Sequence, residues 1–407
     1  MLLAGKLDKR QQNKYTLRNI NDRSMFFGRD DEIQRVIDEV QTRRPFIILY
    51  GQKRIGKTSL MVHLAEHILP QTCDVVTVPY DVHELTPFEP QTFLLSLAQA
   101  ARTKIHDERI HKHQDQPTGT DLTRIERKIP RLRARDLIQD PYNRFATWVN
   151  EVQRRLNGTR LLFMIDEFTR AEEEIGRGLD PTFFDGLQSL VDNHNIGFLL
   201  CVHDNIYNDL SHSWGMMQRG TPIHLMSLEP DPAARLVRQP LERIYKFSDA
   251  IVKRILRLTN CHPYFIHAVG MEISAQMREM QHDTVTPQDL QNAVMRVLRN
   301  GDHYFSHYRG SVDKNTWETL KTIANIAGID NTWVSYDTIR QAQAGSLGDS
   351  ISMSGRFAVQ SLYRTRIIDA HTTHDNRVEY RIPVELLQLW LRQLTNPLIT
   401  RDMQRED

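Results

Sequence analysis

The chain has 407 residues, which is enough for two or three domains of ordinary size. Hydrophobic residues make up 40% and charged residues 25%, so the chain can bury a large apolar core without a disulfide or metal to hold it together. Its formal net charge of +1 excludes a strong overall attraction to nucleic acid or to a membrane surface.

The three cysteines, Cys73, Cys201 and Cys261, are far apart and form no CxxC pair. This argues against a zinc ribbon or a disulfide framework and favours a reducing compartment. The N-terminus lacks the apolar segment of a signal peptide, and no stretch approaches the roughly 18 apolar residues of a membrane helix. We therefore predict a cytoplasmic protein with no membrane partner.

Residues 1–24 are polar and basic and are expected to form an irregular lead-in. Between residues 25 and 228, short apolar runs alternate with helical stretches. Buried parallel strands have this pattern, so an α/β sheet with right-handed crossovers is predicted. The expected strands are Pro45–Tyr50, Val75–Val82, Leu161–Ile165, Ile196–Val202 and Pro222–Leu228.

A glycine-rich loop follows the first of these strands and precedes a helical stretch over 59–68. That context is typical of a phosphate-binding P-loop, in which backbone N–H groups and a helix N-terminus face phosphate oxygens. Lys57 is predicted to reach the β- and γ-phosphates, and the Thr58 hydroxyl to ligate Mg²⁺. The residues predicted to bind nucleotide are Gly51, Gln52, Lys53, Arg54, Ile55, Gly56, Lys57, Thr58 and Ser59.

A long polar stretch, about residues 102–140, separates the second and third expected strands. It carries His106, His111, His113 and a basic run over 124–135, which leaves open a metal site or a nucleic-acid patch. Its charges are mixed in sign and it lacks aromatic residues for base stacking, so a solvated insertion is favoured.

Two carboxylates end the third apolar strand. Asp166 is predicted to hold Mg²⁺ directly or through water, as the Walker B acid does. Glu167 is predicted to be the general base that activates the attacking water. Together with the P-loop, this pair predicts nucleotide hydrolysis.

Polar residues near the last two strands complete the candidate site. His203 is the first candidate, and Asn205 the second, for a side chain that senses the γ-phosphate. Arg219 precedes the last strand and is a candidate arginine finger for a neighbouring subunit, with a solvated surface arginine as the favoured alternative.

The pattern becomes helical over residues 229–300, without strand-like runs, and predicts a small all-helical domain. Thr286-Pro-Gln-Asp289 has the residues of a helix N-terminus. Residues 301–407 contain the helix and strand pattern of a winged helix followed by a C-terminal tail. Its expected elements are helices Asn315–Ala327, Ser335–Gln343 and Met353–Arg366, strands Ile367–Ala370 and Val378–Ile382, and a last helix Pro383–Leu394.

Several segments together resemble the STAND ATPases (signal-transduction ATPases with numerous domains), most closely the prokaryotic branch. These belong to the AAA+-like, ASCE division of P-loop proteins, and the resemblance covers roughly residues 15–395. Besides the P-loop, it rests on Phe26-Phe-Gly-Arg-Asp30, Asp166-Glu-Phe168, Leu228-Glu-Pro230 and Thr259-Asn-Cys-His-Pro-Tyr264.

The resemblance implies a sheet order of 5-1-4-3-2, followed by a helical lid and a winged helix. It places Phe27, Gly28 and Arg29 in the adenine pocket and Pro263 in the lid motif that closes over the nucleotide. The first glycine of that motif is Cys261 here, a departure from the family pattern. ATP rather than GTP is implied, and no guanine-reading Asn/Thr-Lys-x-Asp motif follows the Walker B strand.

Family members are often switches that ADP holds as closed monomers and ATP opens for assembly. We therefore expect a slow, Mg²⁺-dependent ATPase that signals by a nucleotide-controlled conformational change or by assembly into a homo-oligomer. Its effector is expected either on a separate protein or on a longer protein of which this chain is the ATPase core. A DNA-associated regulator is an alternative, with Arg356, Arg364, Arg366 and Arg377 as DNA contacts, although a winged helix that packs on the ATPase is favoured. A non-hydrolysing scaffold is a third possibility, against which Glu167 argues.

Overall fold

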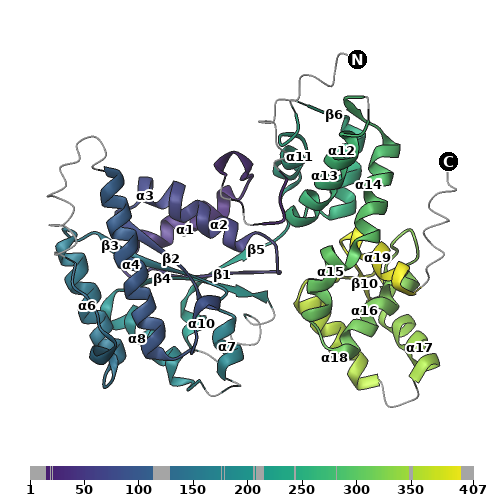
Figure 1. Ribbon diagram of the computed structural model, residues 1–407. Coiled ribbons are helices and arrows are strands. Elements are labelled where there is room, and N and C mark those ends of the chain that lie inside the picture. Colours follow the sequence, from purple (N-terminus) through teal and green to yellow (C-terminus); the bar gives the residue numbers. More distant parts are fainter. Residues whose placement is uncertain are drawn as a thin grey trace. The chain divides into compact units, whose positions relative to one another are not determined.

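The computed structural model describes residues 15–395 apart from 19, 21, 113–128, 176, 178, 205, 206, 208–214, 243, 281 and 348–351. The chain divides into two compact units (Figure 1). Unit 1 consists of residues 1–19, 52–55 and 226–407, and unit 2 of residues 20–51 and 56–225. No helix in the described part of the chain is long and apolar enough to cross a membrane.

Unit 2 is built on a parallel sheet of five strands with the order β2-β3-β4-β1-β5. Read from the other edge, this is the order 5-1-4-3-2, so the predicted fold class is confirmed. Each expected strand is present within three residues at either end. The strands are β1 (Phe46–Gly51), β2 (Val75–Asp81), β3 (Arg160–Asp166), β4 (Gly197–His203) and β5 (Thr221–Leu225).

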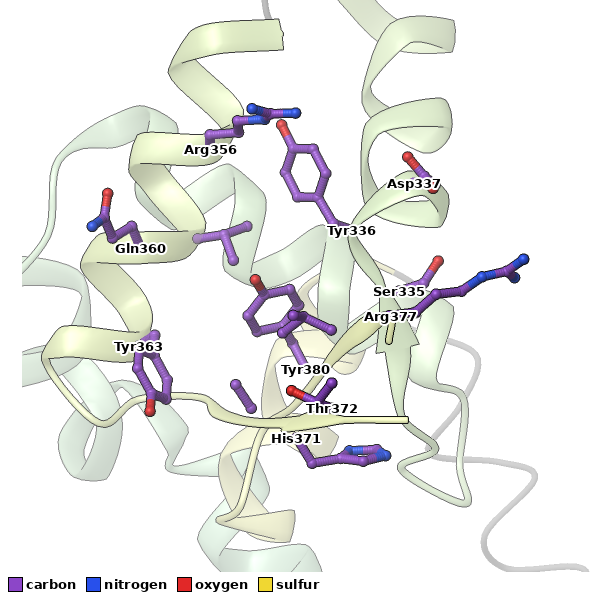
Figure 2. Close-up of a pocket in the computed structure, with 13 residues that line it drawn as sticks. Ser335, Tyr336, Asp337, Arg356, Gln360, Tyr363, His371, Thr372, Arg377 and Tyr380 are labelled. Atoms are coloured by element: carbon purple, nitrogen blue, oxygen red, sulfur yellow. The ribbon is translucent and has the colours of Figure 1, made fainter. Parts of the chain in front are cut away.

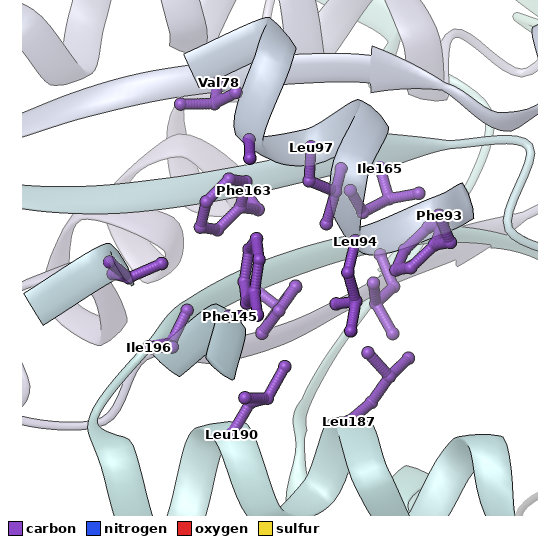
Figure 3. Close-up of a cluster of buried hydrophobic side chains, with 14 of the residues drawn as sticks. Val78, Phe93, Leu94, Leu97, Phe145, Phe163, Ile165, Leu187, Leu190 and Ile196 are labelled. Carbon is purple, nitrogen blue, oxygen red and sulfur yellow. The ribbon is translucent and has the colours of Figure 1, made fainter. Parts of the chain in front are cut away.

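Helices cover both faces of this sheet, which explains why its strands are apolar on both sides. One face packs against α4 (Pro90–Lys112), α6 (Pro141–Arg155) and α8 (Thr182–His194). In this layer Phe145 of α6 lies against Phe163 of β3, with ring centroids 5.5 Å apart, among leucines of α4 and α8 (Figure 3). Ile47 and Leu49 of β1 point to the opposite face of the sheet and are also fully buried.

The opposite face of the sheet carries α1 (Asp30–Val40) and α2 (Lys57–His63), shown in Figure 1. Cys201 of β4 lies there against Met61 of α2, with the two sulfur atoms 3.9 Å apart. The remaining elements of unit 2 are short. They are η1 (Arg23–Met25), the π-helical η2 (Leu64–Ile68), α3 (Leu69–Thr72), η3 (Val82–Glu84), η4 (Ala134–Leu137), α7 (Arg170–Ile175) and α10 (Gly215–Arg219).

The two described ends of the polar stretch expected at about residues 102–140 form helical elements of unit 2. Its first part is helical, because α4 runs on to Lys112, and Ala101 and Ile105 on that helix are buried. Its last part forms η4, where Leu137 is buried. His113 and the first part of the basic run, residues 124–128, lie outside the described residues. The described residues contain no cluster of three His, Cys, Asp or Glu that could hold a metal.

The part of unit 1 that follows β5 is a helical region. Each of its helices buries apolar side chains. The helix start predicted at Thr286 is confirmed, because its side chain accepts a hydrogen bond from the N–H of Asp289 and Pro287 occupies the first turn. The region is not purely helical, since two short strands pair in parallel. Its elements are α11 (Pro230–Arg238), β6 (Lys246–Phe247), α12 (Asp249–Thr259), α13 (Pro263–Met277), β7 (Thr284–Val285), α14 (Pro287–Arg299) and α15 (Gly301–Gly310).

A winged-helix arrangement follows in the same unit, as predicted, with a small antiparallel sheet of order β8-β10-β9. The sequence pattern missed β8 and placed β9 two residues early, because Ile367 and Ile368 are buried core residues ahead of the strand. Trp390 joins α19 to α15, with its ring 5.0 Å from that of Phe305. The elements are α16 (Lys314–Ala327), β8 (Val334–Ser335), α17 (Tyr336–Leu347), α18 (Ser352–Arg364), β9 (Asp369–Thr372), β10 (Val378–Arg381) and α19 (Glu385–Thr395).

The described end of the lead-in is docked on unit 1. Tyr15 is buried, and its hydroxyl donates a hydrogen bond to the carbonyl of Val237 on α11. The ring occupies the space that a side chain at Gly270 would need, since a Cβ there would lie 2.4 Å from it. The N–H of Thr16 donates to Nδ1 of His267 at 3.2 Å.

Candidate nucleotide-binding site

The polar residues of unit 2 gather where the parallel strands end. Gly51 at the end of β1 pairs in register with His203 at the end of β4, and Asp81 at the end of β2 pairs with Asp166 at the end of β3. In open parallel sheets, ligands bind outside these carboxyl ends. The strand register therefore brings residues that are far apart in the sequence to one edge of the sheet.

The P-loop leads from β1 to α2. Gly56 has a φ of 104°, a backbone conformation that favours glycine, and α2 begins at the next residue. Lys57 is only 7% exposed, and its Nζ donates a hydrogen bond to the carbonyl of Gly51 at 2.9 Å. Desolvation lowers the pKa of its ammonium group, and nearby acids including Glu167 and Asp204 oppose that shift. The middle of the loop, residues 52–55, groups with unit 1.

The two predicted Mg²⁺ ligands lie together. Thr58, in the first turn of α2, is hydrogen-bonded through its side chain to Asp166, which is buried at the end of β3. Burial raises the pKa of Asp166, and the hydrogen bond from Thr58 opposes this. A hydroxyl beside a carboxylate fits Mg²⁺, which uses few protein oxygens and fills its other positions with water and phosphate.

Glu167 follows Asp166 in a turn and has a φ of 51°. Left-handed backbone is uncommon for such a residue, and positions of this kind cluster at functional sites. Its Oε2 lies 3.2 Å from Nε2 of His203 and 3.9 Å from Nε2 of His83. The hydrogen bond with His203 lowers the pKa of Glu167 to about 2, so the group is a carboxylate at neutral pH.

Asp204 and His224 belong to the same edge and were not among the predicted site residues. Asp204 directly follows β4 and is 3% exposed, and its Oδ1 lies 3.0 Å from Nε2 of His224 on β5, although the two are not aligned as a hydrogen bond. The imidazole of His224 stacks on Tyr50 of β1, with centroids 4.4 Å apart. The rule that polar residues at the carboxyl ends of parallel strands converge could have identified both, and His83 as well.

The segment predicted to line an adenine pocket packs on the P-loop helix. The ring of Phe26 stacks on His63 of α2, with centroids 4.0 Å apart and planes within 4°. Phe27 is buried, and Gly28 and Arg29 have φ values of 71° and 73° in the turn before α1. The Arg29 guanidinium forms an ion pair with Glu32 at 3.1 Å.

Three other predicted site residues are Arg219, Asn205 and Pro263. Arg219 is 64% exposed at the end of α10 and forms an ion pair with Asp192 at 2.5 Å. Asn205 lies outside the described residues. Pro263 begins α13 in unit 1, and Cys261, which replaces the family glycine, has a φ of 55°, a conformation that glycine adopts more easily.

Comparison with known proteins shows what the part of the chain that carries this edge is similar to. Residues 25–200 match the family model of the AAA ATPase domain. A search of curated proteins gave no match. Among solved structures, the Walker-type ATPase of Pyrococcus abyssi is similar over 93% of this chain and 99% of its own, with 14% identity and a TM-score of 0.65. At that identity the likeness shows the fold alone.

Two weaker structural likenesses have TM-scores below 0.5 and support no conclusion. The Aeropyrum pernix Orc1 protein in complex with DNA is 10% identical, with 96% of this chain and 97% of that chain covered and a TM-score of 0.43. The RuvB Holliday junction branch migration motor of Thermotoga maritima is 13% identical, with 89% and 96% covered and a TM-score of 0.44. Residues 25–200 are thus similar to an AAA ATPase domain, and the P-loop and strand order of unit 2 agree with that match.

Proposed function

We propose that this chain is a Mg²⁺-dependent switch of the STAND type that binds ATP and hydrolyses it slowly. In this proposal, the nucleotide controls a conformational change or an assembly step that acts on a separate effector. The observation that carries the proposal is the convergence of Lys57, the Thr58–Asp166 pair and the Glu167–His203 pair at one edge of the sheet. The AAA ATPase domain match supports the nucleotide chemistry but not the signalling role.

Each residue has a distinct role in the proposed reaction. Lys57 exchanges the carbonyl of Gly51 for phosphate oxygens, which pair its buried ammonium with negative charge. Thr58 and Asp166 would hold Mg²⁺, whose chemistry is to neutralise charge on the phosphates. Glu167 accepts a proton from the attacking water, for which it must be ionised, and its low pKa ensures this at neutral pH.

The contact between Glu167 and His203 accounts for slow, regulated turnover. A carboxylate that is held by an imidazole at 3.2 Å is oriented by that contact, and it is also a weaker base because its pKa is low. His203 thus connects the catalytic carboxylate to the end of β4, where a γ-phosphate sensor is expected. A phosphate bound at this edge would compete with Glu167 for His203 and His83, the two histidines beside its carboxylate.

Phosphate release from ATP by wild type and by Glu167→Gln tests the catalytic proposal. We expect the variant to bind ATP normally and to release phosphate at least about 100-fold more slowly, the effect typical of losing a general base. The matched control is Glu173→Gln, which changes an exposed glutamate on α7. Equal rates for wild type and Glu167→Gln would remove the hydrolytic role.

The assembly step is tested separately by measuring the native mass with ADP and with a non-hydrolysable ATP analogue. We expect a monomer with ADP and a larger species with the analogue. An identical mass in both states, from a protein that binds both nucleotides, would contradict signalling by assembly.

A further inference from the structure

A groove in the winged helix lies between α18 and the two strands of the wing (Figure 2). Its volume is about 680 Å³. The α18 wall consists of residues spaced three or four apart, which share one face of the helix. They are Arg356, Val359, Gln360 and Tyr363.

The opposite wall is one face of the wing sheet. Ala370 pairs with Tyr380, and Thr372 pairs with Val378, in the antiparallel register of β9 and β10. Cross-strand partners point to the same side of a sheet, so these four side chains form a continuous surface. We call the space between the two walls the wing groove.

The bottom of the wing groove is apolar. Val359 is buried there, and Val378, 41% exposed, faces it from β10 together with Ala370 and Tyr380. A surface of this kind is the usual binding site for one or two apolar side chains of a ligand. Three tyrosines, Tyr336, Tyr363 and Tyr380, line the groove, and Figure 2 shows the hydroxyl end of Tyr336 beside Arg356.

Two exposed arginines flank the apolar bottom. Arg356 extends from α18 beside Tyr336, and Arg377 extends from the turn before β10 (Figure 2). Among the described residues, neither guanidinium lies within 4 Å of a carboxylate. Asp337 is the only acid among the described residues that line the groove, and its carboxylate lies 4.0 Å from the Arg340 guanidinium. The wing groove therefore combines an apolar bottom with a net positive rim.

We propose that the wing groove binds an acidic peptide segment of a partner protein, with one apolar side chain on the bottom and carboxylates on Arg356 and Arg377. Arginine pairs well with carboxylates because its guanidinium can donate two parallel hydrogen bonds. Within the described residues, β9 pairs only with β10, so its other edge can bind the backbone of an extended segment. Ala370, His371 and Thr372 of β9 all line the groove, so the groove runs along this edge strand.

Nucleic acid fits this surface less well. Sequence-independent binding of single strands needs open aromatic faces, but Arg356 lies over the ring of Tyr336 at 5.6 Å and Arg366 over that of Tyr363 at 5.5 Å. Duplex recognition needs a polar, cationic helix, and α18 presents Phe357 with 68% of its surface exposed. Two guanidinium groups around an apolar bottom match a short acidic segment better than a phosphate backbone.

A displayed library of random peptides, selected on the full chain, tests the proposal. We expect enrichment of sequences in which an apolar residue is flanked by Asp or Glu. A synthetic peptide of that consensus should lose at least about tenfold in affinity for the double variant Arg356→Glu, Arg377→Glu, since two charge-assisted pairs are removed. Val378→Glu should weaken it as well, because it places a charge on the bottom of the groove.

The matched control reverses two exposed cations outside the groove, Lys253 on α12 and Arg309 on α15, and should leave the peptide affinity unchanged. Lys57→Ala should also bind the peptide normally, so this result is independent of the nucleotide site. Peptides without acids, or equal affinity for the Arg356/Arg377 double variant, would overturn the proposal. Tight binding of an oligothymidine probe that the double variant loses would instead identify a nucleic-acid surface.

Discussion

Both units bury polar side chains, but they arrange them differently. In unit 2, Lys57, Asp166 and Asp204 are buried at one edge of the sheet and interact electrostatically. In unit 1, the buried histidines His267 and His307 pack against aromatic rings, and their pKa values are lowered to about 4 and about 3, mainly by burial and at His307 also by nearby cations. Buried polar groups thus indicate a reactive site where opposite charges converge, whereas histidines kept neutral by burial belong to the structure of the core.

The strongest test of this contrast is Lys57→Ala. We expect ATP affinity to fall at least about 100-fold, because a charge-assisted contact to phosphate is worth roughly 3 kcal/mol. Titration with a fluorescent ATP analogue measures the loss, and Lys253→Ala is the control for removal of an exposed lysine. Unchanged affinity in Lys57→Ala would show that the converging charges are not a nucleotide site.

The histidines of unit 1 should affect stability rather than activity. Between pH 6.5 and about 4 the unfolded chain binds a proton at His267 that the folded chain does not, so the free energy of unfolding falls as the pH falls through that range. A shift from 6.5 to about 4 corresponds to at most about 3 kcal/mol. In the variant His267→Gln, the free energy of unfolding should therefore fall less steeply than in wild type between pH 6.5 and about 4.

Denaturant unfolding at several pH values between 7.5 and 4 measures that sensitivity. The control is His374→Gln, which changes an exposed histidine in the turn of the wing. If His267→Gln loses stability in parallel with wild type as the pH falls, burial of His267 is not the cause.

Asp204→Asn tests whether the edge of the sheet extends beyond the predicted residues. The substitution keeps the size of the side chain and removes the charge beside His224 and near Lys57. We expect kcat to fall about tenfold with a smaller change in KM, as for a group that acts mainly in the transition state. Asp185→Asn, on the exposed surface of α8, is the control, and an equal effect of both variants would remove Asp204 from the site.

Arg219→Ala should have the smallest effect. Its partner is Asp192 and it is largely exposed, and surface ion pairs of this kind contribute about 0–1 kcal/mol. We therefore expect hydrolysis within about twofold of wild type at every protein concentration. The arginine-finger interpretation would be restored if the variant hydrolysed ATP much more slowly than wild type, and if this difference increased at protein concentrations at which wild type assembles.

The sequence was sufficient for those parts of the molecule whose signals are local. The five strands, the P-loop and the Asp166–Glu167 pair are local patterns, and the strand order came from the family resemblance. The short strands β6, β7 and β8 were not predicted, because a strand of two residues is too short to show an alternation of apolar and polar side chains. The continuation of α4 through a polar stretch was missed, because its buried residues are separated by charged ones.

Contacts across the sheet could be read only from the structure. His224 sits on β5 and meets Asp204 across the end of β1, a proximity that depends on the strand order as well as on the residues. The link between His203 and Glu167 likewise needs the register of β3 against β4. In the same way, the wing groove exists because one face of α18 and one face of β10 point toward each other. The sequence alone does not show which faces these are.

The docking of Tyr15 has a consequence for how the molecule is made. The residue that fills the notch at Gly270 is bonded to Val237, 222 positions further along the chain. During synthesis it emerges before α11 and α13, and it cannot be buried until both helices have been translated. This contact therefore depends on a core that is made much later than Tyr15, and it joins two segments that are far apart in the sequence.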